Sequence, residues 1–217
     1  MTEIIKKSNL FRAWKIFLIR KHNKRELFFT VLLLALVLLS FTRFLNYVEL
    51  RAGFTFTDPI LNLFSPIDLT WIIFSLIYIG LIVAIFYFIN DPHLFLTALQ
   101  SYLVLVLFRT AAMYLLPLNP PAGMISLNDP FVQIFGSGEI LTKDLFFSGH
   151  TATLFLLFLI ANKKTLKIIF LTFAVIVGIS VLLQHVHYSI DVFTAPFFSY
   201  TSVKFAAYIK KRYQLRY

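Results

Sequence analysis

The sequence contains no cysteine and is poor in acidic residues. Without cysteine among its 217 residues, the chain cannot form disulfides, thiolate metal sites or a cysteine nucleophile. Charged residues make up 14% of the chain, and only 10 residues are Asp or Glu. Soluble domains usually carry about 25% charged residues. This shortage of charge argues against a soluble protein.

Apolar residues make up most of the sequence. They make up 59% of the chain, and the mean hydropathy is +0.81, whereas soluble domains are about 45–50% apolar. A membrane-spanning helix needs about 20 apolar residues. A chain of 217 residues therefore has room for about six spans and for no second soluble domain. We predict an all-α integral membrane protein.

Six apolar segments divide the chain. They lie near residues 27–48, 70–90, 94–116, 148–162, 165–186 and 189–208. The dipeptides Asp91–Pro92 and Pro120–Pro121 mark breaks, because Pro cannot continue a helix that it interrupts. The first apolar run begins after residue 26 and is long enough to span, so it is expected to be a retained helix rather than a signal peptide. One six-helix membrane domain is therefore predicted over residues 27–208.

The net charge of +10 follows membrane topology and does not indicate nucleic-acid binding. Sixteen of the 20 Lys and Arg lie within residues 1–26, 163–167 and 204–216. These regions fall on one side of a six-span bundle, and basic loops stay in the cytoplasm. We predict that both termini are cytoplasmic and that the active site lies on the exoplasmic face, which in a bacterium is the periplasm.

The two ends of the chain are both basic. Residues 1–26 combine eight Lys or Arg with apolar residues at roughly helical spacing. This pattern is typical of an amphipathic helix in the headgroup region of a bilayer, and a solvated cytoplasmic tail is the alternative. Residues 209–217 are expected to form a short basic cytoplasmic tail.

The first group of chemically active side chains opens the fourth apolar segment. Ser148, Gly149 and His150 form a small-residue turn at a helix N-terminus, which offers N–H groups and a positive dipole end to an anion such as phosphate. His150 could then give a proton to a leaving oxygen. The alternative is that Ser148 only caps the helix while His150 faces water.

His187 and Asp191 form the second group. Four residues apart, they would share one face of a helix. A carboxylate bonded to one imidazole nitrogen leaves the other as a better nucleophile, and the cost of charge within a span favours function over a plain interfacial ion pair. A metal site with His185 would require a non-helical turn, because side chains two apart on a helix point to nearly opposite sides. Without a metal, His185 is expected to have a structural role or to support the residues that contact the substrate.

Arg109 is a lone cation within the third apolar segment, where it needs an anionic partner. Asp191 or a bound phosphate would serve, and a guanidinium binds phosphate through two hydrogen bonds. Tyr114 and Tyr188 are candidate hydroxyl donors, although interfacial Tyr is common without such a role. Asp144 could pair with a cationic headgroup or could act as a helix cap.

Four stretches of the chain carry a family resemblance. They are Arg109–Thr110–Ala111–Ala112–Met113–Tyr114, Phe147–Ser148–Gly149–His150–Thr151, His187–Tyr188–Ser189–Ile190–Asp191–Val192 and the weaker Pro66–Ile67–Asp68. They resemble the signature motifs of the sphingomyelin synthase family, in a bacterial-type member, within the type 2 phosphatidic acid phosphatase superfamily. The resemblance extends over about residues 55–205. The chain departs from the family in lacking Cys-Gly before Asp144 and in having a single Arg where members often have two.

The resemblance implies a reaction. His187, oriented by Asp191, attacks the phosphorus of a donor phospholipid, and His150 protonates the departing diacylglycerol oxygen. The phosphohistidine keeps the headgroup, and His150 then acts as base for the hydroxyl of an acceptor, ceramide or diacylglycerol. No metal or diffusible cofactor is required. The expected partners are the two lipids and the bilayer.

Phosphatases of the wider superfamily carry a Lys-x6-Arg-Pro motif and a Ser-Arg-x5-His-x3-Asp motif. At the same spacing this chain has Arg109, Leu116 and Pro117, then Ser180 and Val181, so apolar residues replace two of three cations. A phosphomonoester carries about −1.5 to −2 charges at neutral pH, whereas a phosphodiester carries one. We therefore predict a headgroup transferase, with phospholipase-C-like hydrolysis as a related activity. The alternatives are a lipid phosphate phosphatase and a non-enzymatic lipid-binding or transport protein.

Overall fold

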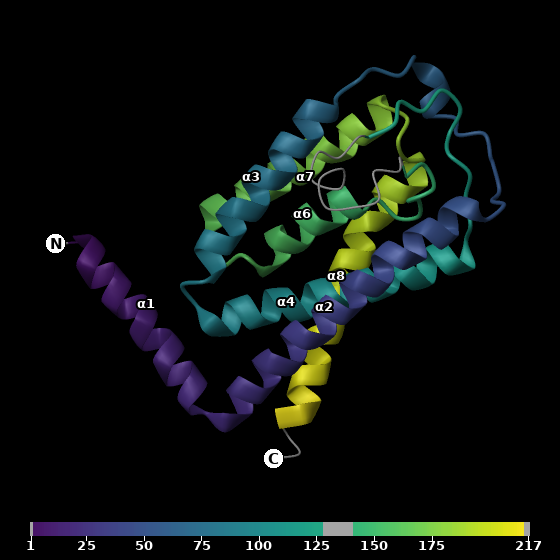
Figure 1. Cartoon of the computed structure of the whole chain (residues 1–217). Coiled ribbons are helices and arrows are strands. Elements are labelled where there is room, and N and C mark those ends of the chain that lie inside the picture. Colours follow the sequence, from purple (N-terminus) through teal and green to yellow (C-terminus); the bar gives the residue numbers. More distant parts are fainter. Residues whose placement is uncertain (1, 128–140, 215–217) are drawn as a thin grey trace.

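The computed structural model describes residues 2–127 and 141–214, which form a bundle of helices (Figure 1). The elements are α1 (Thr2–Ile19), α2 (Lys21–Leu50), the 3-10 helix η1 (Leu61–Leu63), α3 (Thr70–Phe88), α4 (Pro92–Leu115), α6 (Gly149–Ile160), α7 (Lys164–Leu183) and α8 (Ser189–Gln214). Across the described residues no strand forms, and one isolated bridge pairs Phe54 with Leu118. The predicted all-α class is confirmed.

A helix occupies each of the six predicted apolar segments. Among the described helices, four are long and apolar enough to cross a membrane, namely α2, α3, α4 and α7. α6 has only 12 residues. α8 has 26 residues, but Asp191, Lys204 and several hydroxyl side chains lower its hydropathy. The helices indicate a membrane protein, while the predicted count of six spans is not confirmed.

α6 lies at the centre of the bundle, where it packs against α3, α4, α7 and α8 (Figure 1). Its side chains Leu154 and Leu156 are almost fully buried. A helix that is apolar on every face is typical of a protein interior. Neighbouring helices cover α6, and bilayer thickness therefore does not set its length.

α8 is held by hydroxyl side chains as well as by apolar packing. Thr194, Thr201 and Ser202 each donate to the carbonyl four residues earlier. Ser199 makes the same bond and also donates to the Ala152 carbonyl on α6, at 2.8 Å. Such bonds satisfy polar groups where water is scarce. They allow a helix of moderate hydropathy to pack closely on α6.

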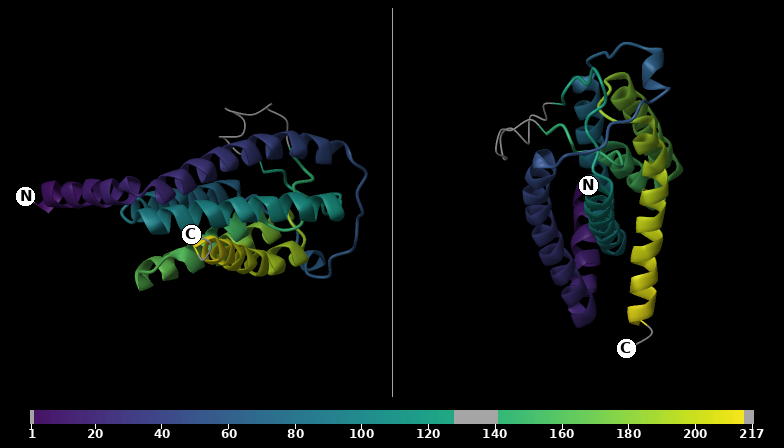
Figure 2. Two further views of the ribbon diagram at one scale, coloured as in Figure 1. Left: turned by 90° about the horizontal axis from the view of Figure 1, so that it is seen from below. Right: turned by 90° about the vertical axis from the view of Figure 1, so that its right-hand side faces the viewer.

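The N-terminal segment bends where α1 meets α2, and α1 projects away from the other helices (Figures 1 and 2). The boundary differs from the predicted one, because α1 ends at Ile19 and α2 already begins at Lys21. Trp14 Nε1 donates to the Ile89 carbonyl at 2.8 Å, and Phe17 is buried. The second half of α1 is therefore anchored on the turn between α3 and α4.

The C-terminal basic segment is helical where the structure describes it. α8 continues to Gln214, and residues 209–214 of the predicted basic tail therefore extend this helix. The last part of the predicted tail, residues 215–217, lies outside the described residues.

One end of the bundle collects the loops around the turn between α7 and α8 (Figure 1). Gln184, fully buried in that turn, ties it to two other segments, one at the start of α3 and one after α4. Its side-chain oxygen accepts from the Leu69 amide at 3.0 Å, and its side-chain nitrogen donates to Thr70 Oγ1 at 2.9 Å and to the Ile125 carbonyl at 3.1 Å. These contacts fix the turn that carries His187.

Candidate active site

The first turn of α6 brings together the predicted Ser-Gly-His sequence. Ser148 is the N-cap, and its hydroxyl lies 3.0 Å from the Thr151 hydroxyl and accepts from the Thr151 amide at 3.4 Å. The Ser148 amide donates to the Asp191 carbonyl at 3.0 Å. Ser148 therefore serves as a buried helix cap that joins α6 to α8, which agrees with the capping role considered for it. His150 lines the cavity described below.

His187 and Asp191 are paired, though not by the predicted geometry. Their Nδ1 and Oδ2 atoms lie 3.2 Å apart, and both side chains are buried. The expectation that both lie on one helix is wrong, because α7 ends at Leu183 and α8 begins only at Ser189. His185, at φ 56°, turns the chain out of the helical path.

The pairing fixes the state of the His187 ring. The distance allows the carboxylate to accept a hydrogen bond from Nδ1–H, and in that tautomer Nε2 carries the free lone pair. The same Asp191 oxygen accepts from the Tyr188 amide at 3.3 Å. Asp191 thus holds both the ring of His187 and the backbone that follows it.

Asp58, from the loop between α2 and α3, caps this turn from the other side. Its carboxylate accepts from the Ser189 amide at 2.6 Å and from the Ile60 and Leu61 amides at 2.9 and 3.4 Å. Burial raises the pKa of Asp58, but these amides favour the ionised form more strongly, and its pKa falls below the usual value. Asp58 therefore stays charged at neutral pH.

Arg109 is buried, and its partner is Asp144. Its Nη2 donates to Asp144 Oδ1 at 2.6 Å and to the Asp144 carbonyl at 3.3 Å, while Nη1 donates to the Phe147 carbonyl. Asp191, one of the two anionic partners considered for Arg109, instead pairs with His187. Burial raises the pKa of Asp144, but the neighbouring donors and cationic groups, chiefly the Arg109 guanidinium, together lower it, and the net pKa is below the usual value.

Gly149 allows the Arg109 side chain to lie against the start of α6. A Cβ atom at this position would come within 2.7 Å of Cζ and Nη1 of Arg109. Any larger residue would displace the guanidinium. A guanidinium has five N–H donors, so Arg109 keeps hydrogens beyond those given to Asp144 and Phe147.

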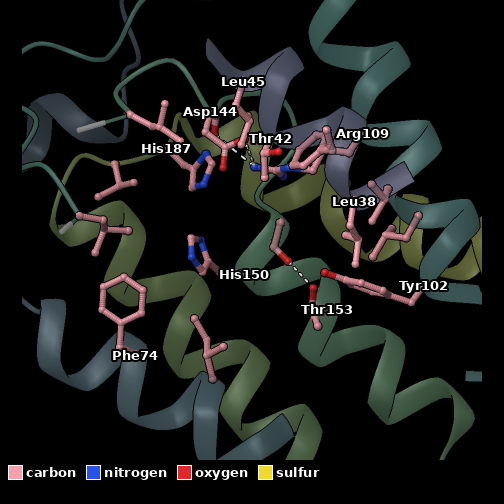
Figure 3. A pocket seen from close by; sticks show the side chains of 18 of the residues that line it. Leu38, Thr42, Leu45, Phe74, Tyr102, Arg109, Asp144, His150, Thr153 and His187 are labelled. Atoms are coloured by element: carbon pink, nitrogen blue, oxygen red, sulfur yellow. Dashed lines mark hydrogen bonds and ion pairs between the residues drawn. The ribbon is translucent and has the colours of Figure 1, made fainter. Parts of the chain in front are cut away.

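A cavity of about 390 Å³ joins these residues (Figure 3). Its polar end consists of Arg109, Asp144, Gly149, His150 and His187. Figure 3 shows the rings of His150 and His187 pointing toward one another, with the Arg109–Asp144 pair beside them. Apolar side chains of α2, α3 and α4 form most of the remaining wall. Five of the nine predicted site residues thus line one cavity.

Residues 143–208 match the family model described as PAP2 superfamily C-terminal. No match was found among curated proteins, and none among solved structures. The matched segment contains Asp144, His150, His187 and Asp191, whereas Arg109 precedes it. Members of this superfamily are phosphatases or phosphotransferases, so the match indicates an activity of the lipid phosphatase or phosphotransferase type.

The two predicted tyrosines lie away from the cavity. Tyr188, in the PAP2-like segment, is buried, stacks on Phe56 with ring centroids 4.0 Å apart, and donates to the Asn119 carbonyl at 3.0 Å. Tyr114 is exposed, and its ring lies 5.1 Å from the Arg51 guanidinium. Tyr114 follows Arg109 by five residues, about 140° around the helix, and therefore points elsewhere.

His185 is turned away from the His187–Asp191 pair. Its Nδ1 lies 3.0 Å from the Ala122 carbonyl, and its ring packs against Phe64. Although this turn is not helical, the two histidines do not converge on one point. No group of three or more His, Asp or Glu side chains in residues 2–127 and 141–214 is placed to hold a metal ion.

Several residues at the site were not predicted. Tyr102, Thr42 and Thr153 line the cavity, and Asp58 and Gln184 hold the turn behind it. Tyr102 precedes Arg109 by seven residues, and helical periodicity could have placed both on one face. Asp58 and Gln184 act on residues more than 100 positions away, and no local pattern in the sequence signals such contacts.

Proposed function

We propose that this chain is a membrane phosphotransferase that moves a phospho-headgroup from a glycerophospholipid to ceramide or diacylglycerol. The observation that carries the proposal is the opposition of His150 and His187 across the cavity, with His187 oriented by Asp191 (Figure 3). One ring is prepared as a nucleophile, and the other can exchange a proton with an oxygen on the far side of the same phosphorus.

In the first step, His187 Nε2 attacks phosphorus and the bond from phosphorus to the diacylglycerol oxygen breaks. His150, in its protonated form, gives its proton to that departing oxygen. The headgroup phosphate is then held on His187, and the imidazolium that forms is stabilised by Asp191. Arg109 and the amides of the first turn of α6 face the phosphate oxygens.

In the second step, His150 accepts the proton of the acceptor hydroxyl, and the acceptor oxygen attacks phosphorus. The bond from phosphorus to His187 breaks, which restores both histidines. Water in place of the lipid alcohol would give hydrolysis of a phospholipase-C type. The balance of the two steps requires no metal ion or diffusible cofactor.

The charge of the cavity supports a phosphodiester donor over a phosphomonoester. Arg109 is already paired with Asp144, and the positions that correspond to two further cations in phosphatases hold Leu116 and Val181. Val181 is fully buried in the apolar core. A phosphomonoester with about −1.5 to −2 charges would be poorly compensated there, whereas a diester carries a single charge.

The test uses purified protein in detergent and a labelled phospholipid, with and without ceramide or diacylglycerol. We expect label transfer that depends on the acceptor and is lost in the His187→Ala variant, with lipid binding retained. Release of inorganic phosphate from phosphatidic acid without any headgroup transfer would identify a phosphatase and contradict the proposal. Turnover that survives in His187→Ala would also contradict the proposal. So would lipid binding without turnover in the wild type.

We also infer that the site faces the exoplasmic side, with both termini in the cytoplasm. In support, Lys163 and Lys164 lie at the opposite end of α6 from the site, and Lys210 and Lys211 at the opposite end of α8. Basic residues stay in the cytoplasm. Because the chain has no cysteine, single Ser65→Cys and Asn162→Cys variants can be labelled in intact cells with a membrane-impermeant maleimide. Labelling of Ser65→Cys alone is expected, and the reverse pattern would contradict the topology.

A further inference from the structure

The cavity extends beyond its charged end into an apolar part. Beyond the histidines its wall is formed mainly by one face each of α2, α3 and α4. The α2 face contributes Leu38, Phe41, Thr42 and Leu45, and the α4 face contributes Tyr102, Leu105, Val106 and Arg109. Both sets follow the spacing of a single helix face. A ligand that fills this space has a polar group at one end and apolar chains at the other.

Tyr102 carries a hydroxyl in the part of the cavity where the wall becomes apolar. It lies two helical turns before Arg109, about 10 Å along α4 at 1.5 Å per residue. Figure 3 shows its side chain pointing into the cavity toward Thr153. Phe41 and Phe74 line the same cavity with no hydroxyl. A phenylalanine could fill the same space, so we expect the hydroxyl of Tyr102 to have a role other than packing.

Within the described residues, the Tyr102 hydroxyl forms no hydrogen bond with another side chain or with the backbone. The neighbouring Thr153 hydroxyl has its proton committed to the Gly149 carbonyl at 2.8 Å. Thr153 therefore has no proton to give to a ligand, whereas Tyr102 has one. A hydroxyl donor in apolar surroundings is costly unless it finds an acceptor.

We propose that the Tyr102 hydroxyl donates a hydrogen bond to a carbonyl oxygen of an acyl linkage in the bound lipid. This proposal rests on the proposed function, because the position of the phosphorus between His150 and His187 sets where the acyl linkages of the bound lipid lie. In a diacyl phospholipid these carbonyls lie a few bonds from the phosphate, where polar groups end and the chains begin. Diacylglycerol and ceramide present the same chemistry as an ester or an amide carbonyl.

The test compares Tyr102→Phe with the wild type on matched lipids. The donors are the diacyl and dialkyl ether forms of phosphatidylcholine, phosphatidylethanolamine and phosphatidylglycerol, because the ether forms lack only the carbonyls. One lost neutral hydrogen bond corresponds to roughly a threefold to tenfold change. We expect KM for the diacyl donor to rise by that factor with a smaller change in kcat, and KM for the dialkyl donor to be the same in both proteins.

A second arm separates donor from acceptor. With the donor fixed, diacylglycerol and ceramide are compared with dialkylglycerol as acceptors. If Tyr102→Phe removes the preference for carbonyl-containing lipids among the donors, Tyr102 binds the donor. If it removes that preference among the acceptors, Tyr102 binds the acceptor. Tyr200→Phe, which removes a hydroxyl from an exposed ring on α8, is the matched control and should change neither arm. Equal effects of Tyr102→Phe on acyl and alkyl lipids in both arms, or no effect in either, would overturn the proposal.

Binding measurements separate this proposal from the proposed reaction. The same diacyl and dialkyl phospholipids are titrated into the His187→Ala protein with and without Tyr102→Phe. A preference for diacyl lipid that disappears with Tyr102→Phe supports the carbonyl contact even if the wild type turns over none of these lipids. Turnover by the wild type, together with no diacyl preference in either protein, would reject the contact and leave the reaction standing.

Discussion

The two sides of the cavity are built differently. The side formed by α6, the turn before α8 and the start of α8 is held by hydrogen bonds to carboxylates. Asp191 Oδ2 lies 3.2 Å from His187 Nδ1, and Asp58 accepts from the Ser189 amide at 2.6 Å. The α2 side presents mainly apolar side chains, and α2 packs chiefly on α4. Its polar contacts gather near its ends, where Glu26 accepts from Gln100 at 2.9 Å and Glu49 from the Thr142 amide at 2.9 Å.

This difference separates two tasks. Attack on phosphorus needs fixed distances, and buried hydrogen bonds supply them. Lipid chains vary in length and saturation, and contacts driven by apolar burial accept such variation because they are non-directional. We therefore expect substitutions on the α6–α8 side to change turnover, and substitutions on the α2 side to change chain preference.

The largest effect is expected from Gly149→Ala. The added Cβ would meet the Arg109 guanidinium at 2.7 Å and would displace it from the proposed phosphate site. A displacement of about 1 Å can cost a factor of about 100 in rate, and we expect kcat/KM to fall by about 10- to 100-fold. Steady-state kinetics on the purified variant measure this change.

Gly80→Ala is the matched control for that prediction. Its Cβ would also meet a neighbour at 2.7 Å, but this neighbour is Leu154 Cδ2, the flexible end of an apolar side chain. We expect lower thermal stability with kcat/KM near the wild-type value. Equal losses of activity in both variants would show that the Arg109 contact has no special role.

A smaller effect is expected from Asp58→Ala. Asp58 and Asp68 both lie in the loop between α2 and α3, and each accepts from backbone amides near a helix start, of α8 and α3 respectively. Loss of such a cap costs about 0.5–2 kcal/mol of stability, so both alanine variants should melt earlier. Only Asp58→Ala should also lower kcat, by roughly threefold to tenfold, which corresponds to about 0.7–1.4 kcal/mol.

Comparable kcat in the two aspartate variants would mean that the Asp58 bond to Ser189 stabilises the fold without positioning His187. An Asp58→Asn variant, which keeps an acceptor oxygen but loses the charge, should recover part of the rate. The outcome distinguishes a positioning role from a purely structural one.

Acid should weaken the contact between Arg109 on α4 and Asp144, which precedes α6. The pKa of Asp144 is lower in the folded protein than in the unfolded chain, because Arg109 and the other groups around it together outweigh the effect of burial. Its ionised form therefore adds stability above the unfolded pKa, and this stability is lost as the pH falls through the unfolded pKa toward the folded one. Tm should be level from pH 8 to 5 and should fall below about pH 4.

The Asp144→Asn variant tests that explanation. It should be less stable than the wild type at neutral pH, because Arg109 loses its charged partner, and its Tm should fall less steeply in acid. Identical slopes of Tm against pH in the two proteins would assign the acid sensitivity to other carboxylates, of which Asp58, with its lowered pKa, is the next candidate.

The smallest effect is expected on the α2 side. Leu45→Val removes one methylene from the cavity wall, worth about 0.8 kcal/mol or roughly fourfold. We expect kcat to stay constant while the preferred acyl chain length shifts upward. Leu39→Val, on the exposed face of α2, should leave the chain-length profile unchanged. A fall in kcat with Leu45→Val and no shift in preference would argue against the division of tasks.

Local patterns predicted the helices well and the side-chain partners less well. Apolar segments and Pro breaks placed all six helices, and Asp91 with Pro92 does begin α4. Span number was less predictable, because a short helix such as α6 can be buried by neighbours. Tyr114 was selected by its closeness to Arg109 in sequence, whereas Tyr102, on the same helix face as Arg109, lines the cavity.

The sequence by itself determined the all-helical class, the apolar character and the presence of two histidine motifs, because these follow from composition, periodicity and the rarity of polar groups. Only the tertiary structure decided that Arg109 pairs with Asp144, 35 residues away, and that Asp58 caps the turn at Ser189, 131 residues away. The physical reason is range. Helix formation depends on neighbours within a few positions, whereas a buried charge is satisfied by whichever group the fold brings to it.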